Sequence, residues 1–199
     1  EIDKERLVIF EEMKMRRDNP RIHVTDVLQS YLYGGTLGKN LIGSEKTMNA
    51  IDRIKMVKKF KEIYRPNNLI LCVVGNAEFK DVVNFAEKNF GNEKGEVPKF
   101  EISLKNDSGV EKRKGLDQAN LVFAYHVPMA EDEKSYAAIV LNCILAGGMS
   151  SRLFSEIREK RNLAYAVKGS SDIHRDYSHN SIYVGTKAEN VEKVRKLIL

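Results

Sequence analysis

Residues 147–165 constrain the fold of this chain more than any other stretch of its sequence. Gly147 and the glycine after it stop one helix. Ser150 or Ser151 caps the next, because a hydroxyl oxygen accepts a hydrogen bond from the free N–H groups of a helix start. That helix ends near Lys160, and Tyr165 then enters a strand. The stretch predicts two helices joined by a tight turn and followed by a strand.

The spacing of apolar residues predicts further helices along the chain. They cover residues 2–15, 24–33, 45–64, 78–90, 133–145 and 189–199. The first two are separated by Asp18, Asn19 and Pro20, because proline cannot continue a helix.

Strands are predicted at residues 68–75, 119–127, 164–170 and 181–185. The first is nearly all apolar, which is typical of a central strand. The last two form a hairpin joined by the polar segment 172–179. Cys72 and Cys143 lie in apolar runs and are predicted to be core thiols. Residues 92–117 are rich in glycine and charge, and so are the best candidate for a domain boundary or linker.

Charge and hydropathy exclude two classes of partner. The net charge is +5, but lysines alternate with Asp and Glu along the chain. This pattern favours a solvated mixed surface over a nucleic-acid footprint, and a basic binding module for nucleic acid would rest on the +5 alone. No apolar run approaches the roughly 20 residues that span a bilayer, so no membrane segment is expected. The charged residues 1–6 indicate the interior of a helix rather than a signal peptide, and we interpret the chain as a fragment.

Two pairs of residues are candidates for chemistry. Glu5 and Glu12 are two helical turns apart and therefore share one face. A carboxylate is a normal third ligand of catalytic zinc, although two such glutamates also suit a face in water. Arg158 and Tyr165 carry donors that stabilise a forming negative charge. In the alternative interpretation, Arg158 is a cation at a helix end and Tyr165 a half-buried strand residue.

Other catalytic and ligand-binding patterns are absent from the sequence. The four histidines are His23, His126, His174 and His179, and none has another four residues away, where two imidazoles would share a helical face. His174 and His179 flank the polar residues 175–178 and are predicted to be surface loop histidines, with a zinc pair there as the alternative. The phosphate-binding Gly-x-x-x-x-Gly-Lys-Ser/Thr loop and the Gly-x-Ser-x-Gly nucleophile elbow are missing.

Residues 147–165 closely resemble the second-domain signature of the pitrilysin/insulinase family of zinc metallopeptidases, which includes the mitochondrial processing peptidases. Residues 5–12 resemble the family helix that supplies the third zinc ligand. Two turns depart from the family pattern: Ala146 replaces a third glycine, and residues 34–38 replace a His-Pro turn. The zinc-binding His-x-x-Glu-His motif is absent from the 199 residues.

The resemblance implies an α+β fold in which helices pack on a largely antiparallel sheet. It implies two homologous domains, each partly represented. Residues 1–96 would be the later part of the catalytic zinc domain, residues 97–117 a linker, and residues 118–199 the first part of the second domain.

The resemblance also implies a zinc-dependent endopeptidase that hydrolyses peptides or unfolded protein segments inside an enclosed chamber. Glu12 would be the zinc ligand and Glu5 a carboxylate behind it, while Arg158 and Tyr165 would hold the substrate carbonyl and stabilise its oxyanion. Zinc would bind in the complete protein, whose histidine ligands lie outside this chain, and the isolated chain is expected to be inactive. A cytoplasmic location and a homodimer, or a heterodimer with a related subunit, are further expectations. The alternative is a non-catalytic partner or structural subunit of the same family.

Overall fold

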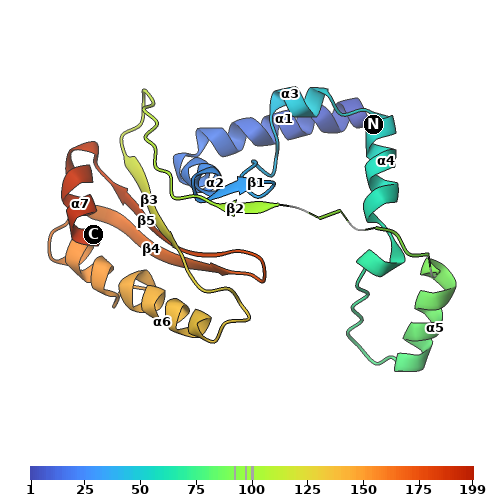
Figure 1. The fold of residues 1–199 in the computed structure, drawn as a ribbon. Coiled ribbons are helices and arrows are strands. Elements are labelled where there is room, and N and C mark those ends of the chain that lie inside the picture. Colours follow the sequence, from blue (N-terminus) through green and yellow to red (C-terminus); the bar gives the residue numbers. More distant parts are fainter. Residues whose placement is uncertain (92, 97, 100) are drawn as a thin grey trace. The chain divides into compact units, whose positions relative to one another are not determined.

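A computed structural model describes residues 1–91, 93–96, 98–99 and 101–199 of the chain (Figure 1). Its described residues form two compact units. Unit 1 comprises Glu1–Phe10 and Ser44–Phe100, and unit 2 comprises Glu11–Gly43 and Glu101–Leu199. Compactness and homology are different criteria, so the domain boundaries expected from the sequence remain a prediction.

Side-chain caps set the helix boundaries in unit 1. Its complete helices are α3 (Glu45–Asn49), α4 (Arg53–Ile63), the 3₁₀ helix η1 (Pro66–Asn68) and α5 (Phe79–Phe90). The Ser44 hydroxyl accepts a hydrogen bond from Thr47 N, and the Asp52 carboxylate accepts one from Lys55 N. The single helix predicted over residues 45–64 is therefore two helices, because Asp52 caps a new start.

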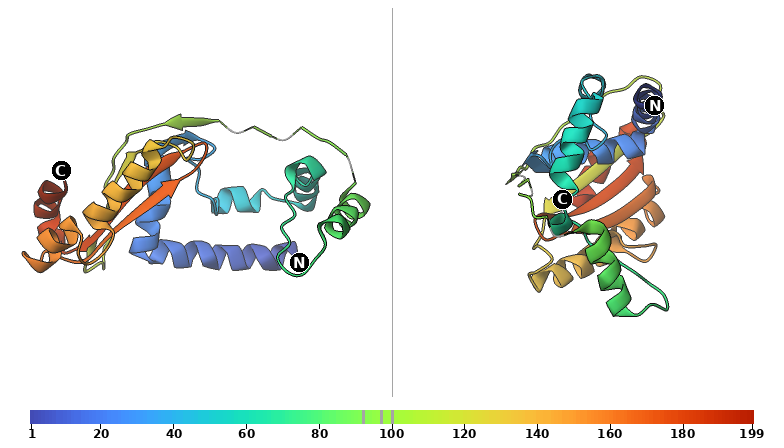
Figure 2. Two further views of the ribbon diagram at one scale, coloured as in Figure 1. Left: turned by 90° about the horizontal axis from the view of Figure 1, so that it is seen from below. Right: turned by 90° about the vertical axis from the view of Figure 1, so that its right-hand side faces the viewer.

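The strand predicted at residues 68–75 is wrong. After η1 this segment follows an open path to α5 (Figures 1 and 2), with Ile70 97% and Val74 94% exposed. A strand exists only when its N–H and C=O groups pair with a neighbour, and the described residues of unit 1 contain no other strand. Cys72 and Cys143 are exposed, so the prediction of core thiols is also wrong.

Unit 2 is built on an antiparallel sheet of three strands. They are β3 (Ala119–His126), β4 (Ala164–Ile173) and β5 (Ser178–Thr186), arranged in the order β3-β5-β4. A short antiparallel pair, β1 (Tyr33–Gly35) and β2 (Ile102–Leu104), was not predicted. The hairpin strands are longer than predicted, because Asp172 pairs across the sheet with His179 and leaves a short turn. The α+β class is confirmed.

Helices cover both faces of this sheet. On one face lie α6 (Lys134–Ala146) and the π-helical turn η2 (Phe154–Glu159), and Figure 2 shows α6 running along the strands. On the other face lies α2 (Pro20–Leu32). The helix α7 (Val191–Ile198) ends the chain. The buried core lies on the α6 side and consists of Ala146, Leu153, Phe154, Ile157, Ala164, Val167, Ile182, Val184 and Val194.

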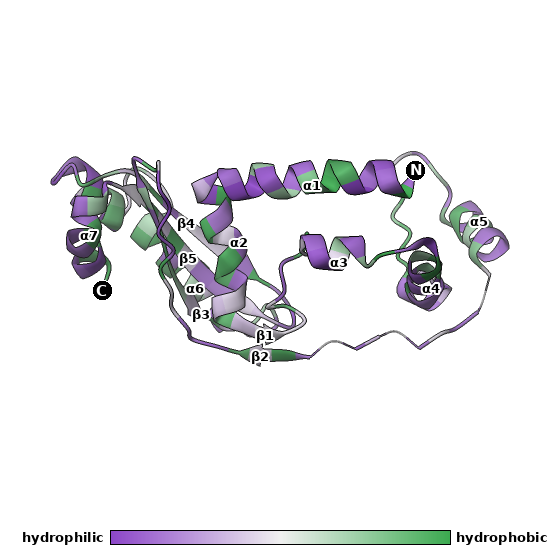
Figure 3. Cartoon of the chain, turned by 90° about the horizontal axis from the view of Figure 1, so that it is seen from above, coloured by the Kyte–Doolittle hydropathy of each residue, from purple (hydrophilic) through white to green (hydrophobic). Residues whose placement is uncertain are grey.

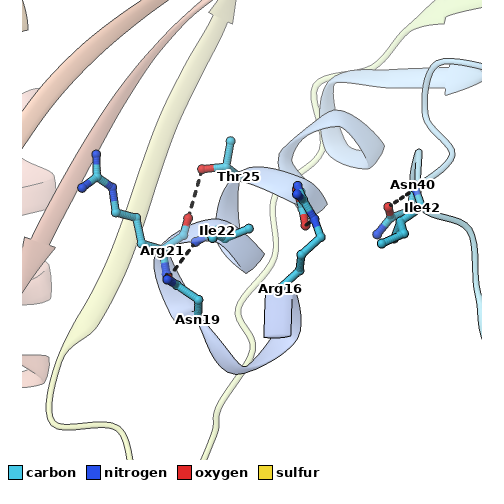
Figure 4. A network of polar contacts seen from close by, with 8 residues as sticks. Arg16, Asn19, Arg21, Ile22, Thr25, Asn40 and Ile42 are labelled. Atoms are coloured by element: carbon cyan, nitrogen blue, oxygen red, sulfur yellow. Dashed lines mark hydrogen bonds and ion pairs between the residues drawn. The ribbon is translucent and has the colours of Figure 1, made fainter. Parts of the chain in front are cut away.

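The junction between the first two helices follows the prediction. The helix α1 (Ile2–Asp18) ends before Asn19, whose side-chain oxygen accepts hydrogen bonds from Arg21 N and Ile22 N (Figure 4). Pro20 occupies the first position of α2, where its missing N–H costs nothing.

Candidate functional site

The two candidate carboxylates, Glu5 and Glu12, both lie on α1 and both are exposed. In Figure 3 hydrophilic residues dominate this helix and are interrupted by shorter hydrophobic bands. The Glu12 carboxylate lies near enough to Arg16, one turn further on, to contribute to the raised pKa of that guanidinium, which is set mainly by its hydrogen bond to Asp26. The helix therefore presents the predicted carboxylates to solvent.

These residues do not amount to a zinc site. A catalytic zinc takes three protein ligands and keeps a fourth position open. No group of three His, Cys, Asp or Glu side chains in the described part of the chain is arranged to hold a metal ion. This chain offers one candidate ligand, the carboxylate of Glu12, and no reaction step through zinc follows from its residues alone.

Arg158 lies in η2, the turn that residues 147–165 predict as a helix. A π-helical turn carries an extra residue and is frequent at functional sites. Ile157 is fully buried and anchors the turn in the core, whereas Arg158 is exposed. The guanidinium carbon of Arg158 lies 4.9 Å from the ring centroid of Phe154, in cation–π contact. The side chain is thus supported on one side and open to solvent on the other.

The backbone between η2 and β4 turns sharply. Lys160 N donates to Ser155 O at 2.9 Å, the five-residue bond of a π-helical turn, and Leu163 N then donates back to Ile157 O at 2.9 Å. Asn162 has φ of 49°, a left-handed conformation that asparagine adopts more readily than most residues. Tyr165 follows as the second residue of β4.

Tyr165 lies at a β-bulge. The pairing of β4 with β5 shifts between Ala164 and Ala166, so Tyr165 has no partner residue of its own. Bulges occur next to active sites, where they redirect a side chain. The phenol oxygen of Tyr165 lies 3.3 Å from that of Tyr183 on β5, and the side chain is 48% exposed. In the part of the chain that the structure describes, Arg158 and Tyr165 share no hydrogen bond, although both belong to one short segment of unit 2.

A polar cavity of about 380 Å³ lies between α2 and the sheet. Tyr183 lines it, and the Arg21 side chain extends away from α2 (Figure 4) to place its guanidinium carbon 4.9 Å from the Tyr183 ring centroid. Burial, followed by the hydrogen bond with Tyr165, raises the pKa of Tyr183. Its phenol is therefore a neutral donor throughout the physiological range. The remaining walls are formed by Thr25, Leu28, Gln29, Val122, Lys168, Gly169, Ser170, Asp172, Tyr177, His179 and Ser181.

The cavity adjoins a buried hydrogen-bonded group around His179. Its Nε2 lies 3.4 Å from the Asp172 carboxylate, and its Nδ1 lies 3.1 Å from the Tyr33 hydroxyl. Burial lowers the pKa of His179 and raises that of Tyr33 to about 12. The prediction of a surface loop position for His179 is wrong, because this residue is a buried member of β5.

The sequence did not identify Tyr183 and Gly185 as neighbours of Tyr165, or Asn120 as the hydrogen-bond partner of Tyr183. Asn120 and Gly185 face each other across β3 and β5, while Gly185 also pairs with Ala166 of β4. Such neighbours depend on the register of three strands, and register is set by pairing and turn length rather than by a local motif.

Comparison with known proteins identifies consistent relatives. The family described as the peptidase M16 inactive domain matches residues 50–199. An uncharacterized zinc protease of Bacillus subtilis, YmxG, is 32% identical over 100% of this chain and 49% of its own length. An uncharacterized zinc protease of Rickettsia felis is 33% identical over 98% of this chain and 48% of its own length. The chain therefore spans about half the length of the curated relatives it matches.

Solved structures share the fold. A protease from Helicobacter pylori matches with a TM-score of 0.81 at 24% identity, covering 98% of this chain and 51% of that one. A peptidase M16 inactive domain from Pseudomonas fluorescens matches with a TM-score of 0.80 at 23% identity, covering 99% and 49%. In the described part of the chain, no helix is both long and apolar enough to cross a bilayer.

Proposed function

Because this chain belongs to the peptidase M16 family, we propose that the full-length protein is a zinc-dependent endopeptidase and that this chain supplies part of its active site. The relatives that cover the whole chain are named zinc proteases, which supports peptide hydrolysis. The substrates would be peptides or unfolded protein segments enclosed in a chamber between two homologous domains.

The observation that carries the proposal is the geometry of Tyr165. A bulge frees it from strand pairing, and its half-exposed phenol is held by a neighbouring hydroxyl. A positioned neutral donor of this kind stabilises the oxyanion that forms when a peptide carbonyl is attacked. Arg158, exposed on the preceding turn, would hold the same carbonyl through its guanidinium group.

Glu12 would contribute one carboxylate to zinc, with Glu5 behind it on the same helix face. When bound, zinc supplies Lewis acidity and lowers the pKa of a bound water. The histidine ligands and the general base would come from residues outside this chain. An extended peptide would bind as an added strand, a mode in which main-chain hydrogen bonds give affinity.

Replacement of Tyr165 tests the proposal in the full-length protein. We expect Tyr165→Phe to lower kcat on an unstructured peptide about 100-fold, the usual effect of losing one oxyanion donor, with an unchanged melting temperature. Tyr136→Phe is the matched control, because Tyr136 is 70% exposed on α6 and far along the chain from the η2–β4 segment. Equal turnover in the wild type and both variants would argue against the proposed role.

A second candidate is a non-catalytic partner or structural subunit, acting in a heterodimer with a related chain or in a homodimer. The matching family is described as an inactive domain, and this description is also compatible with the alternative. It predicts that Tyr165→Phe leaves peptide hydrolysis by the assembled complex unchanged.

A further inference from the structure

We propose that Tyr183 is a positioning residue for Tyr165, through a chain of hydroxyl and amide groups that crosses all three strands of the sheet. The inference rests on the proposed function, since it assumes that Tyr165 acts on substrate. The hydrogen bonds run from Tyr165 on β4, through Tyr183 on β5, to Asn120 on β3.

The direction of each hydrogen bond follows from the number of protons available. Tyr183 has a single hydroxyl proton, and it donates to Asn120 Oδ1 at 2.7 Å. The amide of Asn120 is oriented by its own Nδ2, which donates to Gln118 O at 3.4 Å. Tyr183 therefore accepts from Tyr165, and the Tyr165 phenol is the donor in the 3.3 Å contact.

The length of this contact suits a residue whose hydroxyl must exchange one hydrogen-bond acceptor, Tyr183, for another on the substrate. At 3.3 Å it is longer than the 2.7–2.8 Å typical of hydroxyl pairs, and is correspondingly weak. The Tyr165 hydroxyl can turn toward an arriving oxyanion at little cost while the ring stays in place. Tyr183 keeps its stronger bond to Asn120 and is not displaced.

Gly185 provides the space in which the Tyr165 ring lies. A Cβ atom at this position would lie 2.5 Å from Cε1 and Cζ of Tyr165 and 2.6 Å from its hydroxyl oxygen. These distances are far inside van der Waals contact, so any larger residue pushes the ring away. The ring ends a flexible side chain, and its displacement is cheap for folding. The glycine is thus needed for the position of Tyr165 rather than for the strand.

Tyr183 is itself held firmly. It is 8% exposed, and Arg21 of α2 lies over its ring. A cation–π contact of this kind is attractive and helps to hold the ring in place. The support for Tyr165 therefore extends from the sheet to the helix on its face.

The test uses Tyr183→Phe and Gly185→Ala in the full-length protein, with steady-state kinetics on an unstructured peptide. We expect each variant to lower kcat about tenfold and to change KM less than twofold, because ground-state binding does not need the phenol of Tyr165. The double variant Tyr165→Phe/Tyr183→Phe should be no slower than Tyr165→Phe alone. Additive losses in the double variant would overturn the inference.

Tyr125→Phe is the matched control for a lost hydroxyl in the same sheet. The Tyr125 hydroxyl also makes a 3.3 Å hydrogen bond, with Asn180, and has no contact with Tyr165. We expect its kcat to equal that of the wild type. A tenfold fall in Tyr125→Phe as well would overturn the inference, because the effect would then be a general one on the sheet.

The outcomes separate the inference from the function on which it rests. If Tyr165→Phe is slow while Tyr183→Phe and Gly185→Ala turn over normally, the positioning role is wrong and the proposed function stands. If Tyr165→Phe itself is fully active, the proposed function is wrong and the inference falls with it. Gly185→Ala retains every hydroxyl, so it tests position even if Tyr183→Phe folds poorly.

Discussion

His179 combines burial with two hydrogen-bonding neighbours. Its Nε2 proton faces the Asp172 carboxylate, so Nδ1 carries no proton and accepts from the Tyr33 hydroxyl. His126 and His174 act on it electrostatically, and both disfavour a further positive charge. The neutral imidazole is therefore the form that the folded protein holds.

This arrangement predicts a loss of stability in mild acid. Burial places the pKa of folded His179 below its ordinary value of 6.5. Well above pH 6.5 the imidazole is neutral in both the folded and the unfolded state. As the pH falls below 6.5, the unfolded chain takes up a proton that the folded chain resists, and the free energy of unfolding decreases. We expect a lower urea midpoint at pH 5.5 than at pH 7.5.

Two variants test whether the loss of stability in mild acid comes from His179. His179→Gln should reduce the difference between the two midpoints, whereas His174→Gln, at an exposed turn position and with only a minor influence on His179, should keep most of it. Glu111, whose pKa is lowered to about 2 by hydrogen bonds from Arg113 and His23, affects stability only below about pH 4.5. An unchanged wild-type midpoint across this range would contradict the prediction.

At the scale of single residues, the sequence predicted the candidate side chains but not the residues that hold them in position. Glu12, Arg158 and Tyr165 were predicted from the resemblance to the family motifs, and the structure leaves all three exposed. Tyr183 and Gly185 were missed because only the strand register brings them to Tyr165, and Asn120 because it is connected to Tyr165 only through Tyr183.

Among the elements, α2 forms one wall of the cavity that Tyr183 lines. The first turn of α2 depends on its cap, Asn19. The Asn19 oxygen accepts from the N–H groups of Arg21 and Ile22 at 3.1 and 3.2 Å. Removing such a cap costs about 1 kcal/mol. We expect Asn19→Ala to lower the free energy of unfolding by that amount in urea titrations, with an unchanged denaturant slope.

Asn40→Ala is the control for Asn19→Ala. The Asn40 oxygen accepts a single N–H, from Ile42 at 3.1 Å, in a loop rather than at a helix start (Figure 4). A surface change of this kind stays within about 0.5 kcal/mol. Equal losses in the two variants would show that α2 does not depend on its cap.

Element prediction succeeded where local chemistry decides the structure. The break at residues 18–20 and the strand at residues 119–127 follow from proline, caps and apolar pattern. It failed at residues 68–75, where apolar composition suits a strand but the described part of unit 1 has no strand to pair with. It also failed to identify η2 as a π-helix, because a turn of six residues is too short for the spacing of apolar residues to distinguish a π-helix from an α-helix.

At the scale of the whole molecule, the chain would provide part of the proposed site rather than all of it. It spans about half the length of its curated relatives. Its candidate oxyanion donors are on the segment from η2 to β4, and its candidate metal ligand is on α1. The described residues hold no group of three metal-binding side chains. The amount of zinc bound should therefore differ between this chain and the full-length protein.

We expect the 199-residue chain, dialysed and titrated with zinc chloride by calorimetry, to bind no stoichiometric zinc and to hydrolyse no peptide. The full-length protein should hold about one zinc ion per chain, because three protein ligands are needed. In that protein Glu12→Gln should abolish tight binding. Glu5→Gln should weaken zinc affinity or activity about 10- to 100-fold, as expected for a group that orients a ligand.

Glu11→Gln is the matched control for these glutamate variants. It makes the same chemical change one residue away on α1, at an exposed carboxylate that pairs with Lys14 at 2.8 Å. Neighbouring residues on a helix point about 100° apart, so Glu11 and Glu12 cannot both face one metal ion, and Glu11→Gln should retain zinc. Stoichiometric zinc in the isolated chain would place the ligand set within these 199 residues. Retention of zinc by Glu12→Gln in the full-length protein would remove Glu12 from that set.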